Sequence, residues 1–341
     1  MFIEWPWFFS CMVLATAAIV ILFCGIKMTR LSALLAQMTG WGQALVGAVF
    51  LGGLTSLSGL VTSLTAAYHG HASLAISNAL GGIAAQTIFL GIADLTYRKA
   101  NLEHAAASES NLVHCVLLIL LLLVPLMAIS SPEWVLSWIS PFSFIIIAVY
   151  IFGIRMVSKA YAFPMWKPRS SDQTTKEHEK KLPEDGEKVS IICLKLLVFG
   201  VIISFAGWAV GKAGISLSSH LNIQESLTGG VVTAIITSLP ELVIAVAAVR
   251  QGALNLALGN IIGGNCFDML FIAFSDMLYL KGSIYSAIKN TDIFWIALNI
   301  LLISIILLGL LRREKHGIAN IGFENFLIIL IYPLSIWFVF F

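Results

Sequence analysis

Two acidic residues stand in stretches that are otherwise apolar enough to lie inside a membrane. Glu241 follows Pro240 directly in "TSLPELV", and Asp268 ends "GNIIGGNCFD". A charged side chain in the hydrocarbon region is costly, and it marks an ion or proton pathway by default. Carboxylates, hydroxyls and the backbone carbonyls that a mid-span proline releases are also the oxygen ligands that hard cations prefer. The two stretches therefore predict a cation site inside a membrane.

The elements that must hold these acids are membrane spans. Of the 341 residues, 59% are hydrophobic and 11% are charged, whereas soluble domains carry roughly 25% charged residues. A helix needs about 20 apolar residues to cross a bilayer. The runs that meet this length lie near 7–26, 42–69, 72–97, 112–130, 133–157, 190–211, 224–250, 253–280, 291–311 and 322–341. We therefore expect an all-α polytopic membrane protein of about ten transmembrane helices.

The distribution of basic residues predicts how these spans are oriented. If the N-terminus is outside, most Lys and Arg fall on the cytoplasmic side, as the positive-inside rule requires. Both termini are then outside, in what we expect to be the cell (inner) membrane. The polar stretch 158–189 has mixed charge and no apolar periodicity, which is typical of a solvated cytoplasmic linker. It separates a first five-helix repeat, 1–157, from a second, 190–341.

A shift of 182 positions lays residues 55–97 over residues 237–279, and 15 of the 43 positions are identical. Because each half has an odd number of spans, the two copies have opposite orientations in the membrane. Inverted repeats of this kind place a substrate site near the midplane and permit alternating access. The matched aspartates, Asp94 and Asp276, fall at span ends, where capping acids are ordinary anchors.

The stretches around Glu241 and Asp268 resemble the second alpha-repeat of the cation/calcium exchanger superfamily, which includes sodium/calcium and calcium/proton exchangers. The ten-span layout is similar as well, with alpha-repeats at 52–97 and 229–279, so the resemblance covers essentially the whole chain. It implies two inverted five-helix repeats, with spans 2, 3, 7 and 8 around a central cation site and spans 1 and 6 sliding as a gate. The candidate cation ligands are Glu241, Asp268, Thr237, Ser238, Ala234, Asn265, Thr55, Ser56 and Gln86.

The first repeat departs from the family pattern at the site. The family's Pro-Glu pair is Ser58-Gly59 here, and Gln86 matches Asp268, so one of the two central glutamates is missing. The sequence therefore predicts the fold better than the transported substrate. That substrate could be calcium, or the site could hold one sodium-like ion or proton together with a different substrate. Small residues on the repeat-one side also suggest a larger cavity.

We expect a secondary active cation antiporter that couples a sodium or proton gradient to the movement of calcium or another cation. The alternatives are an exchanger fold with a non-calcium cargo and a non-transporting sensor or scaffold. An enzyme is disfavoured, since the sequence has no zinc-binding His-Glu-x-x-His helix, nucleophile elbow or phosphate-cradling loop. We expect no cofactor besides the transported cation, the lipid bilayer as surroundings and no nucleic-acid partner; the oligomeric state stays open.

Overall fold

The computed structural model describes residues 4–39, 52–97, 101–132, 135–167, 169, 188–314 and 322–340. Helices make up nearly all of this part of the chain, which contains one isolated β-bridge, between Leu136 and Ile139. The elements are α1 (Trp7–Thr39), α3 (Gly52–Thr55), α4 (Leu57–Tyr68), α5 (Ala72–Asp94), α6 (Leu102–Ala105), α7 (Glu109–Ser130), α8 (Pro141–Ala162), α9 (Val189–Leu221), α10 (Glu225–Leu227), the π-helix η2 (Thr228–Thr233), α11 (Ala234–Thr237), α12 (Leu239–Arg250), α13 (Leu254–Leu278), the 3₁₀-helix η3 (Ile284–Ala287), α14 (Asn290–Arg312) and α15 (Phe323–Phe340).

Among the described residues, eight helices are long and apolar enough to cross a membrane, and a bent pair of helices makes a ninth span. In that pair, residues 225–237 and α12 meet at an angle of 49°. Pro240 lies in the first turn of α12, where a missing backbone N–H costs little, so the proline starts a helix after the bend. The predicted span 42–69 is described from residue 52 and consists of α3 and α4; its first part lies outside the described residues, as does most of the predicted linker.

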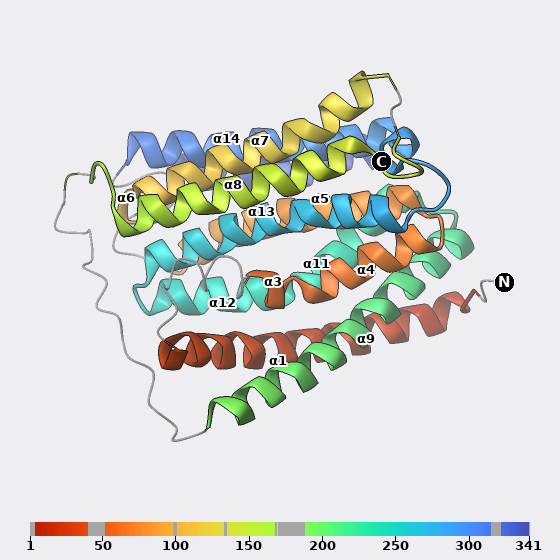
Figure 1. The fold of residues 1–341 in the computed structure, drawn as a ribbon, viewed down its shortest axis with the longest axis horizontal. Coiled ribbons are helices and arrows are strands. Elements are labelled where there is room, and N and C mark those ends of the chain that lie inside the picture. The colour runs from red at the N-terminus through yellow and green to blue at the C-terminus, as the bar shows by residue number, and fades with distance from the viewer. Residues whose placement is uncertain are drawn as a thin grey trace.

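The helices form a bundle with α1 and α9 side by side along one edge (Figure 1). On the opposite side lie α7, α8 and α14, and α5 and α13 run between the two groups with the broken helices α4, α11 and α12. The marked N- and C-terminal ends of the chain lie at the same end of the bundle.

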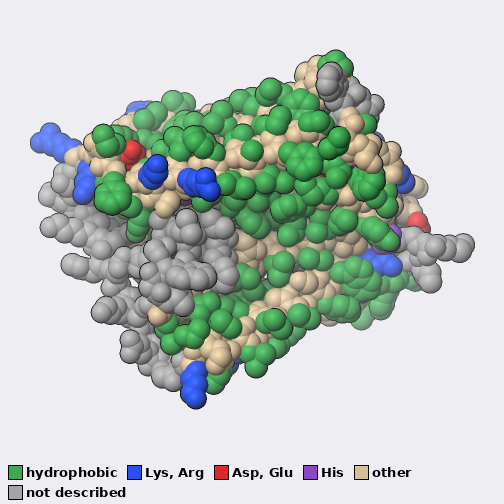
Figure 2. Space-filling model, viewed as in Figure 1, with side chains coloured by type: hydrophobic (Ala, Val, Ile, Leu, Met, Phe, Trp, Pro, Cys, Tyr) green, Lys and Arg blue, Asp and Glu red, His purple; other side chains and the backbone are tan. Residues whose placement is uncertain are grey.

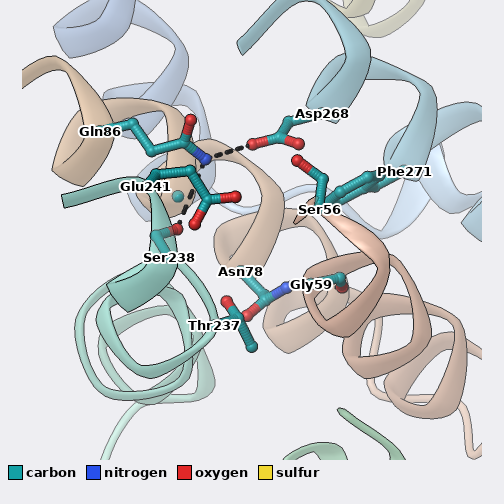
Figure 3. A pocket seen from close by; sticks show the side chains of 10 residues that line it. Ser56, Gly59, Asn78, Gln86, Thr237, Ser238, Glu241, Asp268 and Phe271 are labelled. Atoms are coloured by element: carbon teal, nitrogen blue, oxygen red, sulfur yellow. Dashed lines mark hydrogen bonds between the residues drawn. The ribbon is translucent and has the colours of Figure 1, made fainter. Parts of the chain in front are cut away.

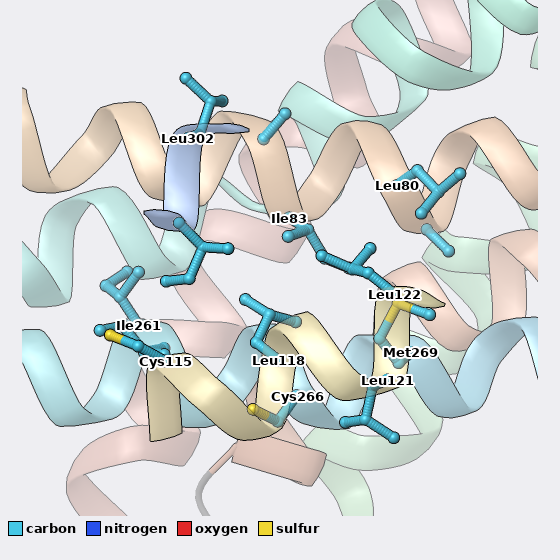
Figure 4. Packing of buried hydrophobic residues seen from close by; sticks show 14 of the residues in the cluster. Leu80, Ile83, Cys115, Leu118, Leu121, Leu122, Ile261, Cys266, Met269 and Leu302 are labelled. Carbon is cyan, nitrogen blue, oxygen red and sulfur yellow. The ribbon is translucent and has the colours of Figure 1, made fainter. Parts of the chain in front are cut away.

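Apolar packing joins α5, α7 and α13 in the interior. Figure 4 shows part of this cluster, in which Leu80, Leu118 and Met269 are fully buried. In lipid, tight packing of small residues drives helix association more than the hydrophobic effect does. Gly81 illustrates this, since a Cβ at this position would overlap the backbone of Gly230. The backbones of α5 and η2 therefore touch directly.

The surface has the pattern of an integral membrane protein. Hydrophobic side chains form a broad band around the visible face, and Lys and Arg side chains gather towards its two ends (Figure 2). Exposed apolar side chains in this band include Phe152 on α8, Leu197 on α9 and Leu308 on α14. Bilayer lipid would cover such side chains.

Asp94, at the end of α5, fastens the last helix of the other half of the chain. Its carboxylate accepts hydrogen bonds from the backbone N–H of Leu102 (2.9 Å), the backbone N–H of Gly322 (3.4 Å) and Nδ2 of Asn325 (2.9 Å). Asp94 is completely buried. It therefore connects α5 and α6 to the start of α15.

Asp276 makes the equivalent three bonds at the opposite end of the molecule. It accepts from the backbone N–H of Ile284 (2.8 Å), the backbone N–H of Ser140 (2.8 Å) and Oγ of Ser143 (2.7 Å). Each of these partners lies 182 positions from the corresponding partner of Asp94, so the internal repeat extends to individual hydrogen bonds. The matched aspartates are thus buried and connect the two halves through hydrogen bonds, instead of capping helices at the membrane interface.

The edge helices contact the broken helices through glycine. A Cβ at Gly25 of α1 would lie 2.6 Å from Cγ of Pro240, and a Cβ at Gly207 of α9 would lie 2.5 Å from the carbonyl oxygen of Ser58. These two contacts are also related by the 182-residue shift. Each edge helix therefore packs against the first turn that follows the break in a span of the other half.

Candidate cation site

Two equivalent breaks in the helices create the site. The helix α3 ends before Ser56 and α4 begins after it, and α11 and α12 are separated in the same way by Ser238. Both serines have non-helical backbone angles, with φ −80° and ψ 4° at Ser56 and φ −100° and ψ 5° at Ser238. A break in a membrane span is tolerated where the backbone is buried in protein or lines a cavity.

A small cavity lies between the two breaks. Its volume, as the space open to the centre of a water molecule, is about 10 Å³, which suits one water molecule or one ion. Its walls come from α4, α5, α11, α12 and α13 and from the two breaks (Figure 3). The lining residues are Ser56, Gly59, Asn78, Gly82, Gln86, Thr237, Ser238, Glu241, Asp268 and Phe271.

The two acids meet at this cavity and have no basic residue beside them there. Glu241 is 3% exposed and Asp268 is 2% exposed, and the lining contains no Lys, Arg or His. Both carboxylate oxygens of Glu241 and Oδ1 of Asp268 lack a hydrogen-bond partner. A buried polar atom without a partner costs about 1–3 kcal/mol, and more when it is charged. A cation is the ligand that would satisfy all three oxygens.

Gln86 links the two repeats inside the site. Its Nε2 donates to Oδ2 of Asp268 at 2.7 Å and lies 3.5 Å from Oγ of Ser238 (Figure 3). Its Oε1 has no hydrogen-bond partner. The amide therefore holds the Asp268 carboxylate in place through its nitrogen.

Asn78 was not among the predicted ligands, yet it lines the cavity and braces both broken helices. Its Nδ2 donates to the carbonyl oxygen of Gly59 at 3.1 Å and to Oγ of Ser63 at 2.9 Å. Its Oδ1 accepts from Oγ1 of Thr233 at 2.7 Å. The signal that could have found it is the identity of Asn78 and Asn260 under the 182-residue shift.

The structure brings together most of the predicted ligands. Glu241, Asp268, Thr237, Ser238, Ser56 and Gln86 line the cavity. Thr55 is buried and its hydroxyl lies next to Glu241.

Two predicted ligands lie away from the cavity lining. The carbonyl oxygen of Ala234 accepts from Oγ1 of Thr237 at 3.2 Å and from the backbone N–H of Ser238 at 3.1 Å, because the helix continues through this position. Asn265 directs its Nδ2 to Oγ1 of Thr87 at 3.2 Å. Neither residue lines the cavity.

Phe271 fills the space that the repeat-one glycine leaves. A Cβ at Gly59 would lie 3.0 Å from Cε2 of Phe271 and 3.6 Å from Oγ1 of Thr237. The expected enlargement of the cavity on this side is therefore absent. Phe271 follows Asp268 by three residues on α13, and this spacing puts both side chains on one helix face.

Comparison with known proteins agrees with this architecture. The family model described as "Sodium/calcium exchanger protein" matches residues 9–157 and 191–341. The inner membrane protein YrbG of Escherichia coli is 27% identical over 322 residues, which cover 91% of this chain and 93% of that protein. The sodium/calcium exchanger MaX1 of Methanosarcina acetivorans is 30% identical over 142 residues, covering 40% of this chain and 41% of that one.

The fold is also that of a solved exchanger. The structure of the sodium-calcium exchanger NCX_Mj superposes with a TM-score of 0.62 at 18% sequence identity, over 97% of this chain and 99% of that chain. The shared fold, the two matched halves and the paired acids at the cavity between the two helix breaks agree with one another. This chain is an integral membrane protein that belongs to the sodium/calcium exchanger family, a family of cation transporters and not of enzymes.

Proposed function

We propose that this protein is a secondary active antiporter that exchanges a cation, calcium or another, against sodium ions or protons by alternating access. The sequence has no nucleotide-binding motif that could drive primary pumping, so an ion gradient supplies the energy.

The observation that carries this proposal is the buried pair Glu241 and Asp268. Two carboxylates without a basic partner at the cavity place a formal charge of −2 in a space about the size of one ion. Burying such charge is expensive unless it is compensated. One divalent cation, or monovalent cations and protons taken up in turn, would compensate it. Calcium prefers six to eight oxygen ligands, and the lining offers carboxylate, amide and hydroxyl oxygens.

The contacts of the edge helices support alternating access. Gly25 and Gly207 keep α1 and α9 close to the broken helices without an interlocking side chain. Helices that meet through glycine can approach closely, and we infer that they also slide with little steric resistance. Sliding of this pair would open the cavity to one side of the membrane and then to the other.

We propose further that the protein lies in the inner membrane with both termini outside. The Escherichia coli relative is described as an inner membrane protein. The distribution of Lys and Arg in the sequence supports the orientation.

Flux measured in proteoliposomes tests the proposal. Purified protein would be reconstituted with calcium, manganese or sodium inside, and the efflux followed under an imposed sodium or proton gradient. We expect gradient-driven cation flux in the wild type and its loss in Glu241→Gln and in Asp268→Asn. Glu314→Gln is the control, because Glu314 pairs with Arg312 outside the site. Cation binding at Glu241 without flux under any gradient would favour the sensor or scaffold alternative.

A further inference from the structure

A second pair of buried acids lies outside the central site, at the end of the molecule where α6 is found (Figure 1). Glu103 on α6 is 2% exposed, and Glu324 in the first turn of α15 is 4% exposed. Neither residue lines the central cavity. The distribution of basic residues assigns this end to the cytoplasm.

The two side chains pack against the same two glycines. A Cβ at Gly322 would lie 2.6 Å from Oε2 of Glu324 and 2.8 Å from Oε2 of Glu103. Both side chains would also crowd a Cβ at Gly309, near the end of α14. The glycines therefore leave room for the two acids to converge, and Oε2 of Glu103 has no hydrogen-bond partner.

The described cationic groups around the pair are engaged elsewhere. Arg313 donates from Nη2 to the carbonyl oxygen of His104 and from Nη1 to that of Arg169, at 3.2 and 3.0 Å. Nδ1 of His104 is 2.7 Å from the carbonyl oxygen of Arg313. Arg312 pairs with Glu314 at 3.4 Å.

The other titratable neighbour is a third acid. Asp94 packs beside the pair, but its carboxylate already accepts three hydrogen bonds, from Leu102, Gly322 and Asn325. These hydrogen bonds favour its ionised form, and its charge disfavours ionisation of Glu103. Burial first, and the nearby charge of Asp94 second, raise the pKa of Glu103 well above its ordinary value of 4.5.

These acids are not part of the internal repeat. Under the 182-residue shift, Asp94 corresponds to Asp276, which fastens the opposite end of the molecule with the same three bonds. Glu103 corresponds to Tyr285, whose hydroxyl lies 3.1 Å from Oγ of Ser143, and Glu324 corresponds to Phe142. An aspartate that connects the two halves is thus present at both ends, whereas the pair Glu103 and Glu324 occurs at one end.

We propose that Glu103 is a proton-binding site, separate from the central site, whose bound proton lets its carboxyl group lie beside that of Glu324 and so holds α6 and the end of α14 against α15. Two like charges beside one another are costly in a buried setting. Loss of the proton from Glu103 leaves a second buried charge beside Gly322 and pushes these elements apart.

The sign of the pH dependence follows from this arrangement. A carboxyl group whose pKa is raised in the folded protein binds more protons there than in the unfolded chain. The stability that it contributes is complete below its ordinary pKa of 4.5. That stability is lost as the pH rises through the raised pKa, so alkaline conditions should loosen α6 from α15.

Thermal unfolding and infrared spectroscopy of the full chain in lipid nanodiscs test the proposal. We expect the midpoint temperature of the wild type to fall as the pH rises from mildly acidic to alkaline, and this fall to shrink in Glu103→Gln and in Glu324→Gln. Each variant removes one charge of the pair and keeps a polar side chain. The control Glu314→Gln should keep the wild-type profile. Difference spectra should show a protonated carboxyl band at neutral pH in the wild type that Glu103→Gln lacks.

Three outcomes would overturn the proposal. The first is a pH profile of unfolding that is the same in the wild type and both variants. The second is the absence of any difference in the carboxyl band between the wild type and Glu103→Gln. The third is stabilisation of the wild type by calcium at neutral pH that Glu103→Gln and Glu324→Gln lose while Glu241→Gln retains it, because the pair would then bind a metal ion instead of a proton.

Discussion

Restoring the missing acid should raise the affinity for a divalent cation, but only after space is made for it. In the variant Gly59→Glu, the new side chain starts from a Cβ that would lie 3.0 Å from Cε2 and 3.6 Å from Cζ of Phe271. The distance to Cε2 is shorter than ordinary van der Waals contact. Overpacking of a dense interior typically costs about 1–3 kcal/mol of stability. The single substitution is therefore expected to gain little. The double variant Gly59→Glu with Phe271→Ala removes the obstructing ring.

The size of the gain follows from the charges. A carboxylate about 4 Å from a divalent cation attracts it by about 8 kcal/mol at an effective dielectric constant of about 20. Taking that carboxylate out of water costs several kcal/mol. A net gain of about 3 kcal/mol remains, which is about a 100-fold increase in affinity.

The matched control is Gly59→Gln with Phe271→Ala, which has the same shape and cavity without the charge. Calorimetric calcium binding to the purified variants would give the two affinities, and sodium-driven calcium flux in proteoliposomes would follow. Equal affinities in the Glu and Gln variants would refute the reasoning, because the missing charge would then not limit this site. Robust sodium-driven calcium exchange by the wild type, unchanged in the Glu variant, would refute it equally.

The remaining predictions address the other parts of the structure. Glu241→Gln should weaken cation binding in calorimetry by about 100-fold, as expected for loss of one partner of a buried charge pair, and wild-type affinity would place the ligand elsewhere. Asp276→Asn and Asp94→Asn should each lower the free energy of unfolding by about 1–3 kcal/mol, since an amide cannot accept all three hydrogen bonds. Thermal unfolding like that of the wild type would contradict the role of these aspartates in connecting the two halves. Gly25→Leu should slow transport at least about tenfold while cation binding persists, because its side chain would block movement past Pro240; an unchanged flux would argue against sliding at this contact.

The spans were predictable because lipid imposes one strong rule on the chain. Backbone polar groups must be satisfied within a segment, so long apolar runs become helices. The limits of the runs were less certain. The span predicted at 133–157 forms α8 from Pro141 instead, since Ser140 caps the helix with its hydroxyl and proline favours the first helical position.

The acids of the site were predictable from their cost in a membrane, but their neighbours were not. Asn265 and Phe271 each lie three residues from Asp268 on α13, one before it and one after it, so both share part of its helix face. Only the packing of α4 and α5 decides that Phe271 meets the cavity while Asn265 turns to Thr87. The partners of Asp94 were hidden for the same reason, because two of them come from the other half of the chain.

The internal repeat distinguishes the residues that stabilise the fold from those that give the central cavity its charge. Asp94 and Asp276 are identical in the two halves and make equivalent bonds, as the frame of an inverted repeat requires. Gly59 and Glu241 differ, and so both formal charges of the cavity come from α12 and α13 in the second half.

Under the proposed exchange, the cation is then held electrostatically by one half, and the first half contributes only neutral oxygens and an amide donor. The two halves therefore cannot exchange roles during the transport cycle as identical repeats could, and the inward-open and outward-open states should differ in cation affinity even when the gradients are equal. Cation affinities measured from the two sides of oriented proteoliposomes would show this difference, and equal affinities would mean that the neutral half compensates for its missing charge.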